Sequence, residues 1–163
     1  MNFTLSNNEK RILVFSILIM ATFLYFNNGW ATHPDSIVYT KHLDFIVGED
    51  NSNNISESLN PRLILRPLLF YLAAPFYFFF GPEIGIGILN SFFYLLSGIM
   101  MYRFVLTNYN DEDLAFFSSV YFVSAFPVLY WGLAILADMG TWFFLLLSLL
   151  LIREQNLEFN TLH

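Results

Sequence analysis

The sequence predicts an all-α, polytopic transmembrane helical bundle of about four spans with one juxtamembrane or re-entrant helix. Of the 163 residues, 56% are hydrophobic and only 12% are charged, whereas soluble domains carry about 25% charged residues. The apolar residues also form stretches long enough to lie in a lipid bilayer. The chain has no cysteine, so disulfide and thiolate sites are excluded. The formal net charge of −6 argues against nucleic acid as a partner, because no basic surface neutralises phosphates.

The first span is predicted over residues 12–30. Its apolar block begins at Ile12, and Trp30 stands at its end as an interfacial anchor. Because no cleavage pattern of small residues follows, an uncleaved span is favoured over a signal peptide. Residues 31–61 follow as a polar, outward loop with a short helix at its start.

Residues 62–80 are predicted to form the juxtamembrane or re-entrant helix. Pro67 and Pro75 interrupt this segment, and the apolar stretch between Pro67 and Gly81 has only 13 residues. Counting lysines and arginines on each side instead favours five spans, with this segment crossing the membrane. We favour four spans because the prolines act locally, while the seven basic residues are a small sample.

Three further spans and a polar tail are predicted over residues 84–106, 114–136, 138–153 and 154–163. The first of these spans contains Gly85, Gly87 and Gly98, small residues that allow membrane helices to approach closely. The next span follows the acidic residues N-D-E-D, which suit a helix N-terminus. The last is short and has to begin near Asp138. The chain is thus expected to be a single membrane domain, complete or part of a longer enzyme.

The stretch ATHPDSIVYTKHLDF, at the start of the outward loop, predicts a capped helix. Thr32 can serve as N-cap, with Pro34 in the first turn and Asp35 three residues after the cap. Asp35, Tyr39 and His42 then follow at i, i+4 and i+7, so one helical face carries a carboxylate, a phenol and an imidazole. From the residues alone, Asp35 is either a charge at a helix start or a catalytic acid.

The order of the segments carries a family resemblance. The first apolar block is followed by HPDSIVY, by RPLLFYLAAPFYFFFG, by a span with several glycines, and by FPVLYWGLAILADMGTWFFLLLSLLL. Together these segments, over residues 12–152, resemble the amino-terminal part of the GT-C integral membrane glycosyltransferases, a superfamily that includes protein mannosyltransferases and aminoarabinose transferases. The resemblance implies an inverting transferase that moves a sugar from a polyprenyl-phosphate donor to an acceptor, on the outer face of a bacterial or archaeal cytoplasmic membrane.

The resemblance also implies roles for single residues. Asp35 takes the place of the family acid that deprotonates the acceptor, and Asp138 matches a second outward-facing acid of supporting role. Arg66, Pro67 and Leu69 resemble the opening of the family's juxtamembrane helix, although Leu68 stands where family members usually have a second proline. Tyr39 and His42, on the face of Asp35, are further supporting candidates.

Binding of the donor phosphate is assigned to Arg62 and Arg66, since guanidinium groups bind phosphate in a bidentate manner. An equal alternative is that both arginines anchor a helix end to lipid headgroups. Glu49 and Asp50 could bind a divalent cation, but two adjacent acids point to different sides of most backbones. The cofactor is therefore left open and no metal site is predicted.

Two other functions stay open. The chain could be a non-catalytic assembly or helper subunit whose glycines pack against a second membrane chain. It could also be a small transporter component with Asp138 as an intramembrane ion or proton site. The enzyme requires Asp35 and Asp138 on one aqueous face, whereas the transporter requires Asp138 within the membrane. GT-C enzymes commonly have more spans, so activity of this part alone is also left open.

Overall fold

The computed structural model describes residues 5–48, 67–136 and 138–161, and the regular structure in these ranges is helical. The helices are α1 (Asn7–Phe26), α2 (Ser36–Val47), α5 (Pro67–Phe80), α6 (Pro82–Tyr109), α7 (Glu112–Ser124), α8 (Phe126–Gly132) and α9 (Asp138–Thr161). The described ranges hold no strand, and one isolated β-bridge pairs Ala31 with Ala134. The prediction of an all-α fold is confirmed.

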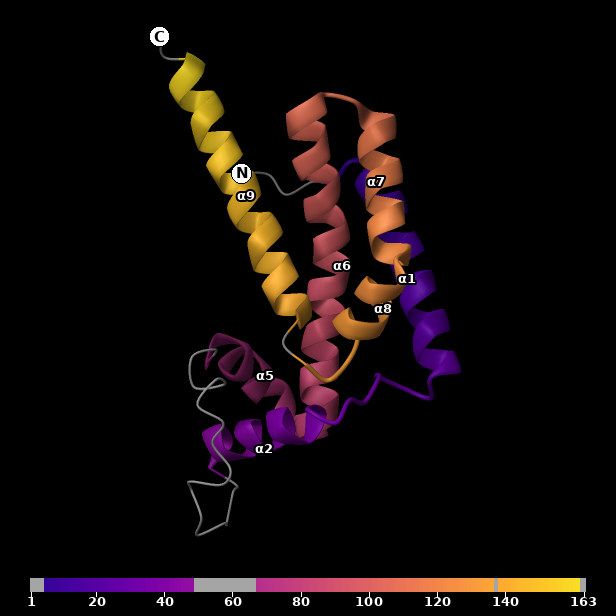
Figure 1. Cartoon of the computed structure of the whole chain (residues 1–163), viewed down its shortest axis with the longest axis vertical. Helices are drawn as coiled ribbons and strands as arrows, with labels where there is room; N and C mark the ends of the chain where they lie inside the picture. Colours follow the sequence, from indigo (N-terminus) through magenta and orange to yellow (C-terminus); the bar gives the residue numbers. More distant parts are fainter. Residues whose placement is uncertain (1–4, 49–66, 137, 162–163) are drawn as a thin grey trace.

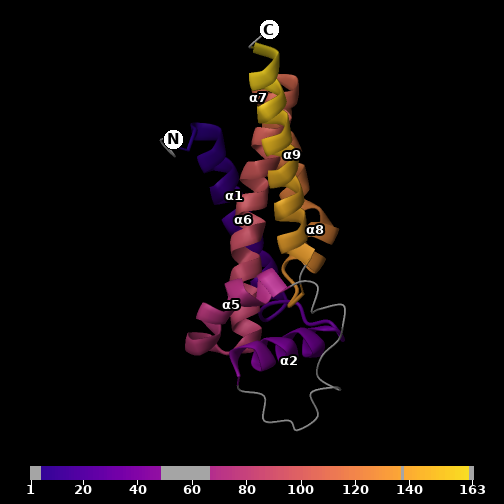
Figure 2. The ribbon, with the colours of Figure 1, turned by 90° about the vertical axis from the view of Figure 1, so that its left-hand side faces the viewer.

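The long helix α6 is the centre of the bundle (Figure 1), and every other helix contacts it. Helices α1, α7 and α9 run beside α6, whereas α2 and α5 lie across one end (Figures 1 and 2). We call this the α2–α5 end, and the opposite end, where α6 turns into α7, the turn end. The chain therefore brings the segment after α1 and the segment before α9 to the same end of the bundle.

Among the described residues, only α6, with 28 residues, is a single helix long and apolar enough to cross a membrane. Helices α7 and α8 meet the same criterion together, but they are bent by 52°. The predicted span over residues 114–136 is therefore not one straight helix. It breaks at Ala125 because Pro127 lies in the first turn of α8, a position that suits the missing N–H of proline, whereas a helix interior does not. The count of four spans stays a prediction.

The predicted role of the α6 glycines in close packing is confirmed. A Cβ atom on Gly87 would overlap the ring of Trp30, and one on Gly85 would lie 3.2 Å from the backbone nitrogen of Tyr77 in α5. A Cβ on Gly98 would lie 2.9 Å from a methyl group of α7. Each glycine therefore admits a different neighbour to the surface of α6.

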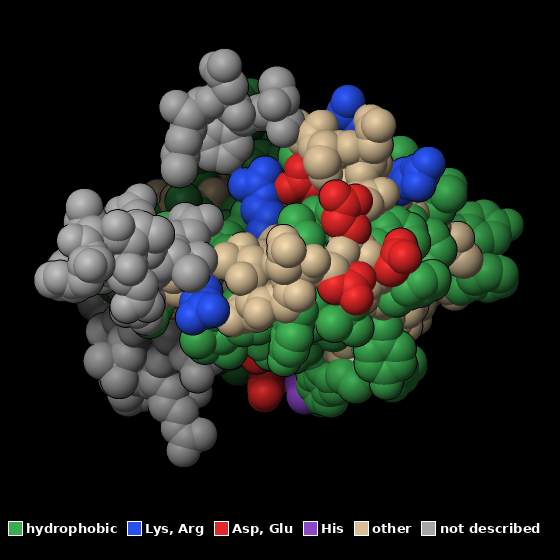
Figure 3. Space-filling model, turned by 90° about the horizontal axis from the view of Figure 1, so that it is seen from above, with side chains coloured by type: hydrophobic (Ala, Val, Ile, Leu, Met, Phe, Trp, Pro, Cys, Tyr) green, Lys and Arg blue, Asp and Glu red, His purple; other side chains and the backbone are tan. Residues whose placement is uncertain are grey.

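A cluster of polar and charged side chains joins α1, α6 and α7 at the turn end, and Figure 3 shows acidic and basic side chains gathered there. The Nε of Arg103 donates a 2.6 Å hydrogen bond to Oε1 of the buried Glu9. Glu9 also forms a capping box with Ser6 at the start of α1, and Asn8 donates to Glu112. Burial alone would raise the pKa of Glu9, but the hydrogen bonds and the charge of Arg103 outweigh it and lower that pKa.

Candidate functional site

Asp35 occupies the N-cap position of α2, at the α2–α5 end. Because α2 begins at Ser36, the prediction of Thr32 as N-cap is wrong. The start of the helix is shifted because a turn closes ahead of it: the backbone N–H of His33 donates to Oγ of Ser36 at 2.9 Å, and the N–H of Ser36 donates back to the carbonyl of His33. The carboxylate of Asp35 accepts no capping hydrogen bond. The contact that would make Asp35 a structural helix cap is therefore missing.

The carboxylate of Asp35 is open to the surroundings and lies beside an imidazole. Its side chain is 70% exposed, and Oδ2 lies 3.7 Å from Nδ1 of His33. That nitrogen accepts a long, 3.4 Å hydrogen bond from the backbone N–H of Asp35, an arrangement that requires an unprotonated Nδ1. A separation of 3.7 Å is also too long for a hydrogen bond. We therefore describe the two side chains as close neighbours that share no hydrogen bond through Oδ2.

A row of aromatic side chains on α8 leads to this acid. The ring of His33 lies 5.1 Å from that of Trp131, Trp131 lies 5.3 Å from Tyr130, and Tyr130 stacks on Phe126 at 5.5 Å. Trp131 is 38% exposed and Phe126 is 68% exposed. These exposed aromatic faces offer an apolar surface to a ligand, and they reach Asp35 only through its neighbour His33.

Asp138 begins α9 at the same end of the bundle and is half-buried. The non-helical segment before it, residues 133–136, is buried against the core. In this segment the N–H of Ile135 donates a 3.1 Å hydrogen bond to the carbonyl of Ala31. We call Ala31 together with residues 133–136 the junction. Asp35 lies four residues after Ala31 and Asp138 lies two residues after Leu136, so both acids extend from the junction.

Tyr39 and His42 face α5, and their surroundings differ from those of Asp35. Their rings lie 5.9 Å and 4.5 Å from the ring of Phe70. His42 is buried, its Nδ1 has no hydrogen-bond partner, and burial lowers its pKa. The predicted stripe is therefore divided between an exposed carboxylate and an imidazole buried in the contact between α2 and α5.

Four of the predicted candidates lie outside the described residues: Glu49, Asp50, Arg62 and Arg66. Their assignments to a cation and to a donor phosphate stay predictions. Within the part of the chain that the structure describes, no three acidic or histidine side chains come together as a metal site would need.

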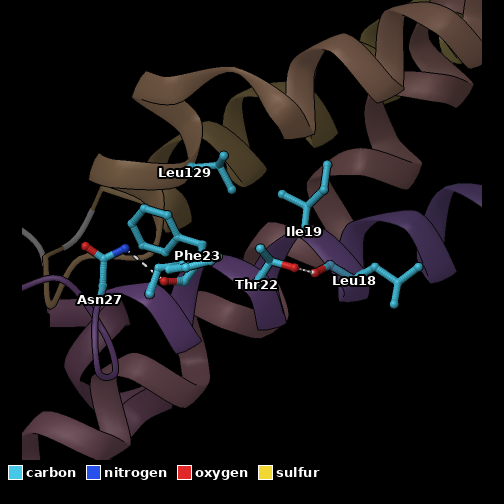
Figure 4. Close-up of a pocket in the computed structure, with 7 residues that line it drawn as sticks. Leu18, Ile19, Thr22, Phe23, Asn27 and Leu129 are labelled. Atoms are coloured by element: carbon cyan, nitrogen blue, oxygen red, sulfur yellow. Dashed lines mark hydrogen bonds between the residues drawn. The ribbon is translucent and has the colours of Figure 1, made fainter.

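An apolar groove of about 360 Å³ lies between α1 and α8 (Figure 4). The lining residues are Leu18, Ile19, Thr22, Phe23, Phe26, Asn27 and Leu129. The two polar members direct their donors to their own helix: Thr22 donates to the carbonyl of Leu18, and Asn27 donates to that of Phe23. The wall that remains is apolar, and it ends at Asn27, four residues before Ala31.

Sequence reasoning missed Asn90, Trp131 and the contact that His33 makes with Asp35. Asn90 is fully buried in α6, and its Nδ2 donates to the carbonyls of Ala134 and Leu136 at 2.6 and 2.8 Å. A signal was present for Asn90, because a lone amide inside an apolar block has to find hydrogen-bond partners. The sequence held no comparable signal for Trp131, whose place next to His33 depends on the bend between α7 and α8.

Comparisons with protein-family models, with curated proteins and with solved structures found no match for this chain. The chemistry and the geometry of the residues around the junction are therefore what bears on its function.

Proposed function

We propose that the chain is a GT-C-type membrane glycosyltransferase, or the amino-terminal portion of one. It would transfer a sugar from a polyprenyl-phosphate donor to an acceptor hydroxyl, at the outer face of a bacterial or archaeal cytoplasmic membrane. The observation that carries the proposal is the junction, because Asp35 and Asp138 extend from it at one end of the bundle. The enzyme needs this arrangement, whereas a helper subunit needs neither acid.

The proposed spans are α1 from Ile12 onward, α6, the bent pair α7 and α8, and α9 up to Arg153, with α2 and α5 lying along the membrane surface. Large apolar side chains on the outside of the bundle support this arrangement: Phe117 is 67% exposed, Tyr121 is 77% exposed and Phe79 is 81% exposed. Surfaces of this kind are unusual in a monomer surrounded by water and ordinary in lipid.

The proposed reaction begins when the acceptor oxygen attacks the anomeric carbon of the donor sugar. A new C–O bond forms, the bond from that carbon to the phosphate oxygen breaks, and its electron pair leaves with the polyprenyl phosphate. The proton of the acceptor hydroxyl passes to the carboxylate of Asp35. A positioned base of this kind contributes on the order of 10²–10⁴-fold. Arg62 and Arg66 are the proposed partners of the leaving phosphate.

The groove between α1 and α8 is the proposed seat of the polyprenyl chain. It is apolar, and its lining includes Asn27, four residues before Ala31, and Leu129, two residues before Trp131. A polyprenyl chain in this groove would bring its phosphate toward the aromatic row of α8, where Trp131 could contact the sugar.

The decisive test is the Asp35→Asn variant, assayed in proteoliposomes with undecaprenyl phosphate carrying mannose, glucose or aminoarabinose as donor. We expect release of undecaprenyl phosphate to fall at least about 100-fold, because the amide cannot accept the proton. Asp44→Asn, on the same helix, is the matched control and should keep full activity. Full transfer by Asp35→Asn, with its thermal unfolding midpoint unchanged, would refute the assigned role.

A second test places the acids relative to the membrane. Single cysteines at positions 35, 138 and 10 in this cysteine-free chain are treated in intact cells with a membrane-impermeant maleimide. Labelling at 35 and 138 but not at 10 supports a shared outer face. Labelling at 35 but not at 138 would support the transporter alternative, or five spans, and would remove the geometric basis of the proposed reaction.

A further inference from the structure

The junction is a stretch of buried backbone outside any helix. Residues 133–136 are between 0% and 5% exposed, yet they make no helical ladder of their own. Buried backbone N–H and C=O groups are costly unless they are paired, and in a membrane the surrounding lipid offers them no partner. The groups that form hydrogen bonds with the backbone of residues 133–136 therefore decide whether this stretch holds one conformation.

Asn90 supplies the partners for two of these carbonyls. Its Nδ2 lies 2.6 Å from the oxygen of Ala134 and 2.8 Å from that of Leu136. Both partners are acceptors, so only the NH₂ side of the amide can face them, and the orientation of the side chain is set by its chemistry. The Oδ1 atom is buried without a hydrogen-bond partner. This unpaired oxygen costs stability, and a leucine at this position would avoid that cost but would hold neither carbonyl.

The two carbonyls flank the residue that joins the two segments of the junction. Ile135, between Ala134 and Leu136, donates its N–H to the carbonyl of Ala31. The next residue of α6, Ser91, holds the other segment through Trp30, the residue before Ala31, because Oγ of Ser91 accepts a 3.0 Å hydrogen bond from Nε1 of Trp30. Two consecutive side chains of α6 thus hold the two segments from which the acids extend.

We infer that Asn90 is a positioning residue that fixes the placement of Asp138 relative to Asp35 by holding the junction against α6. Its catalytic consequence rests on the proposed function, but its structural consequence does not. Asn90 itself contacts no reacting group. It acts through the backbone of Ala134 and Leu136, with Ser91 as a weaker second attachment through Trp30.

Two variants test this inference at constant size. Asn90→Asp keeps the shape of the side chain but sets carboxylate oxygens against two carbonyl oxygens. Asn90→Leu fills the space without any donor. The matched control is Ser97→Ala, which removes a buried polar atom of α6 that has no hydrogen-bond partner. Ser91→Ala, which releases only Trp30, is the milder variant for the case that both Asn90 variants fail to fold.

The first readout is the distance between spin labels on cysteines placed at Ile37 of α2 and Leu145 of α9, both exposed, measured by pulsed electron resonance in nanodiscs. We expect one narrow distribution in the unaltered chain and in Ser97→Ala. We expect a broader or shifted distribution in both Asn90 variants, and a smaller broadening in Ser91→Ala. An unchanged, narrow distribution in the Asn90 variants overturns the inference; if these variants do not fold, an unchanged distribution in Ser91→Ala does so.

The second readout is kinetic, since a misplacement of about 1 Å can cost on the order of 100-fold in rate. We expect kcat of Asn90→Leu to fall by about that factor, while KM for the polyprenyl-phosphate donor changes less than about twofold. Absence of transfer by the unaltered chain would refute the proposed function and leave the distance result standing. Loss of transfer with a narrow distance distribution would overturn the positioning role alone.

Discussion

The two ends of the bundle hold their acidic side chains in opposite ways. At the turn end, the Glu9 side chain is 5% exposed and is joined to Arg103 by a 2.6 Å hydrogen bond. At the α2–α5 end, the Asp35 side chain is 70% exposed and lies 3.7 Å from His33, beyond hydrogen-bonding distance. Both acids stand near the N-terminus of a helix, yet only Glu9 takes part in a capping box.

The difference separates an acid that stabilises the fold from an acid whose carboxylate is exposed to a ligand. The oxygens of Glu9 are occupied by Arg103 and by the backbone of Ser6, and its lowered pKa makes it a poor proton acceptor. Asp35 has none of these contacts, and its neighbour His33 lies against Trp131. The proposed role of Asp35 as a base depends on this exposed carboxylate, and the experiments that follow test whether each end behaves accordingly.

The largest expected effect on stability is at the turn end. Glu9→Ala removes the partner of Arg103, and we expect the free energy of unfolding to fall by about 1.5–3 kcal/mol, the range for hydrogen bonds to charged groups. Transfer per folded molecule should stay unchanged. The measurement is a denaturant titration in detergent, with Lys10→Ala as a control on the same turn. Lost transfer in the folded fraction would contradict the division between the ends.

Acidification should weaken the two ends in sequence. Burial lowers the pKa of His42 below its ordinary 6.5, so the unfolded chain binds a proton first and the contribution of His42 is lost as the pH falls below about 6.5. The pKa of Glu9 is lowered from 4.5, so its contribution is present above pH 4.5 and is lost as the pH falls through the lower, folded value.

The measurement is the unfolding midpoint over a pH series. His42→Phe should remove the loss that begins near pH 6.5, and Glu9→Gln the loss that begins near pH 4.5. If the unfolding midpoint falls in one step with pH, and His42→Phe does not change that step, the contact between α2 and α5 is insensitive to this imidazole.

A moderate effect on activity is expected from the aromatic row. Trp131→Ala should weaken transfer by about two- to tenfold, because an aromatic contact contributes roughly 0.5–1.5 kcal/mol beyond its buried area. Trp131→Phe should keep most of the activity, and Trp142→Ala on α9 serves as the matched control. An equal loss in all three variants would indicate a membrane anchor and not a ligand contact.

The smallest effect compares the two helix starts. Ser6→Ala removes the capping box of α1 and should cost about 1 kcal/mol of stability. Asp35→Ala should cost only a few tenths, through the helix dipole, since no capping hydrogen bond is lost. Equal costs in thermal denaturation would mean that Asp35 is a structural cap after all.

The sequence predicted the helical fold and the close contacts of the α6 glycines from local patterns, because apolar length and small residues act within one segment. It failed at features that the apolar pattern does not reveal, two of them local and one a distant contact. The turn between His33 and Ser36 moved the start of α2, and Pro127 broke the block after Ser124. The partners of Asn90 lie more than 40 residues away along the chain, so no window around it could reveal them.

The site was predictable in part for the same reason. Asp35 and Asp138 stood out as acids next to apolar blocks, and the expectation that they share one end depended on the four-span topology. The different surroundings of His42 and Asp35 could not be predicted. Spacing places both residues on one helical face, but it does not reveal that Phe70 covers part of that face. Trp131 entered the site only through the bend between α7 and α8.

The central place of α6 has a consequence for how the chain folds during synthesis. Helices α1, α2 and α5 are made before α6, and of their main contacts only the one between α2 and α5 can form in its absence. These three helices therefore cannot complete their packing until α6, which ends at Tyr109, has been made. Asn90 and Ser91 are made before the segment at residues 133–136 that completes the junction, so the acid-bearing end closes on a helix that already exists.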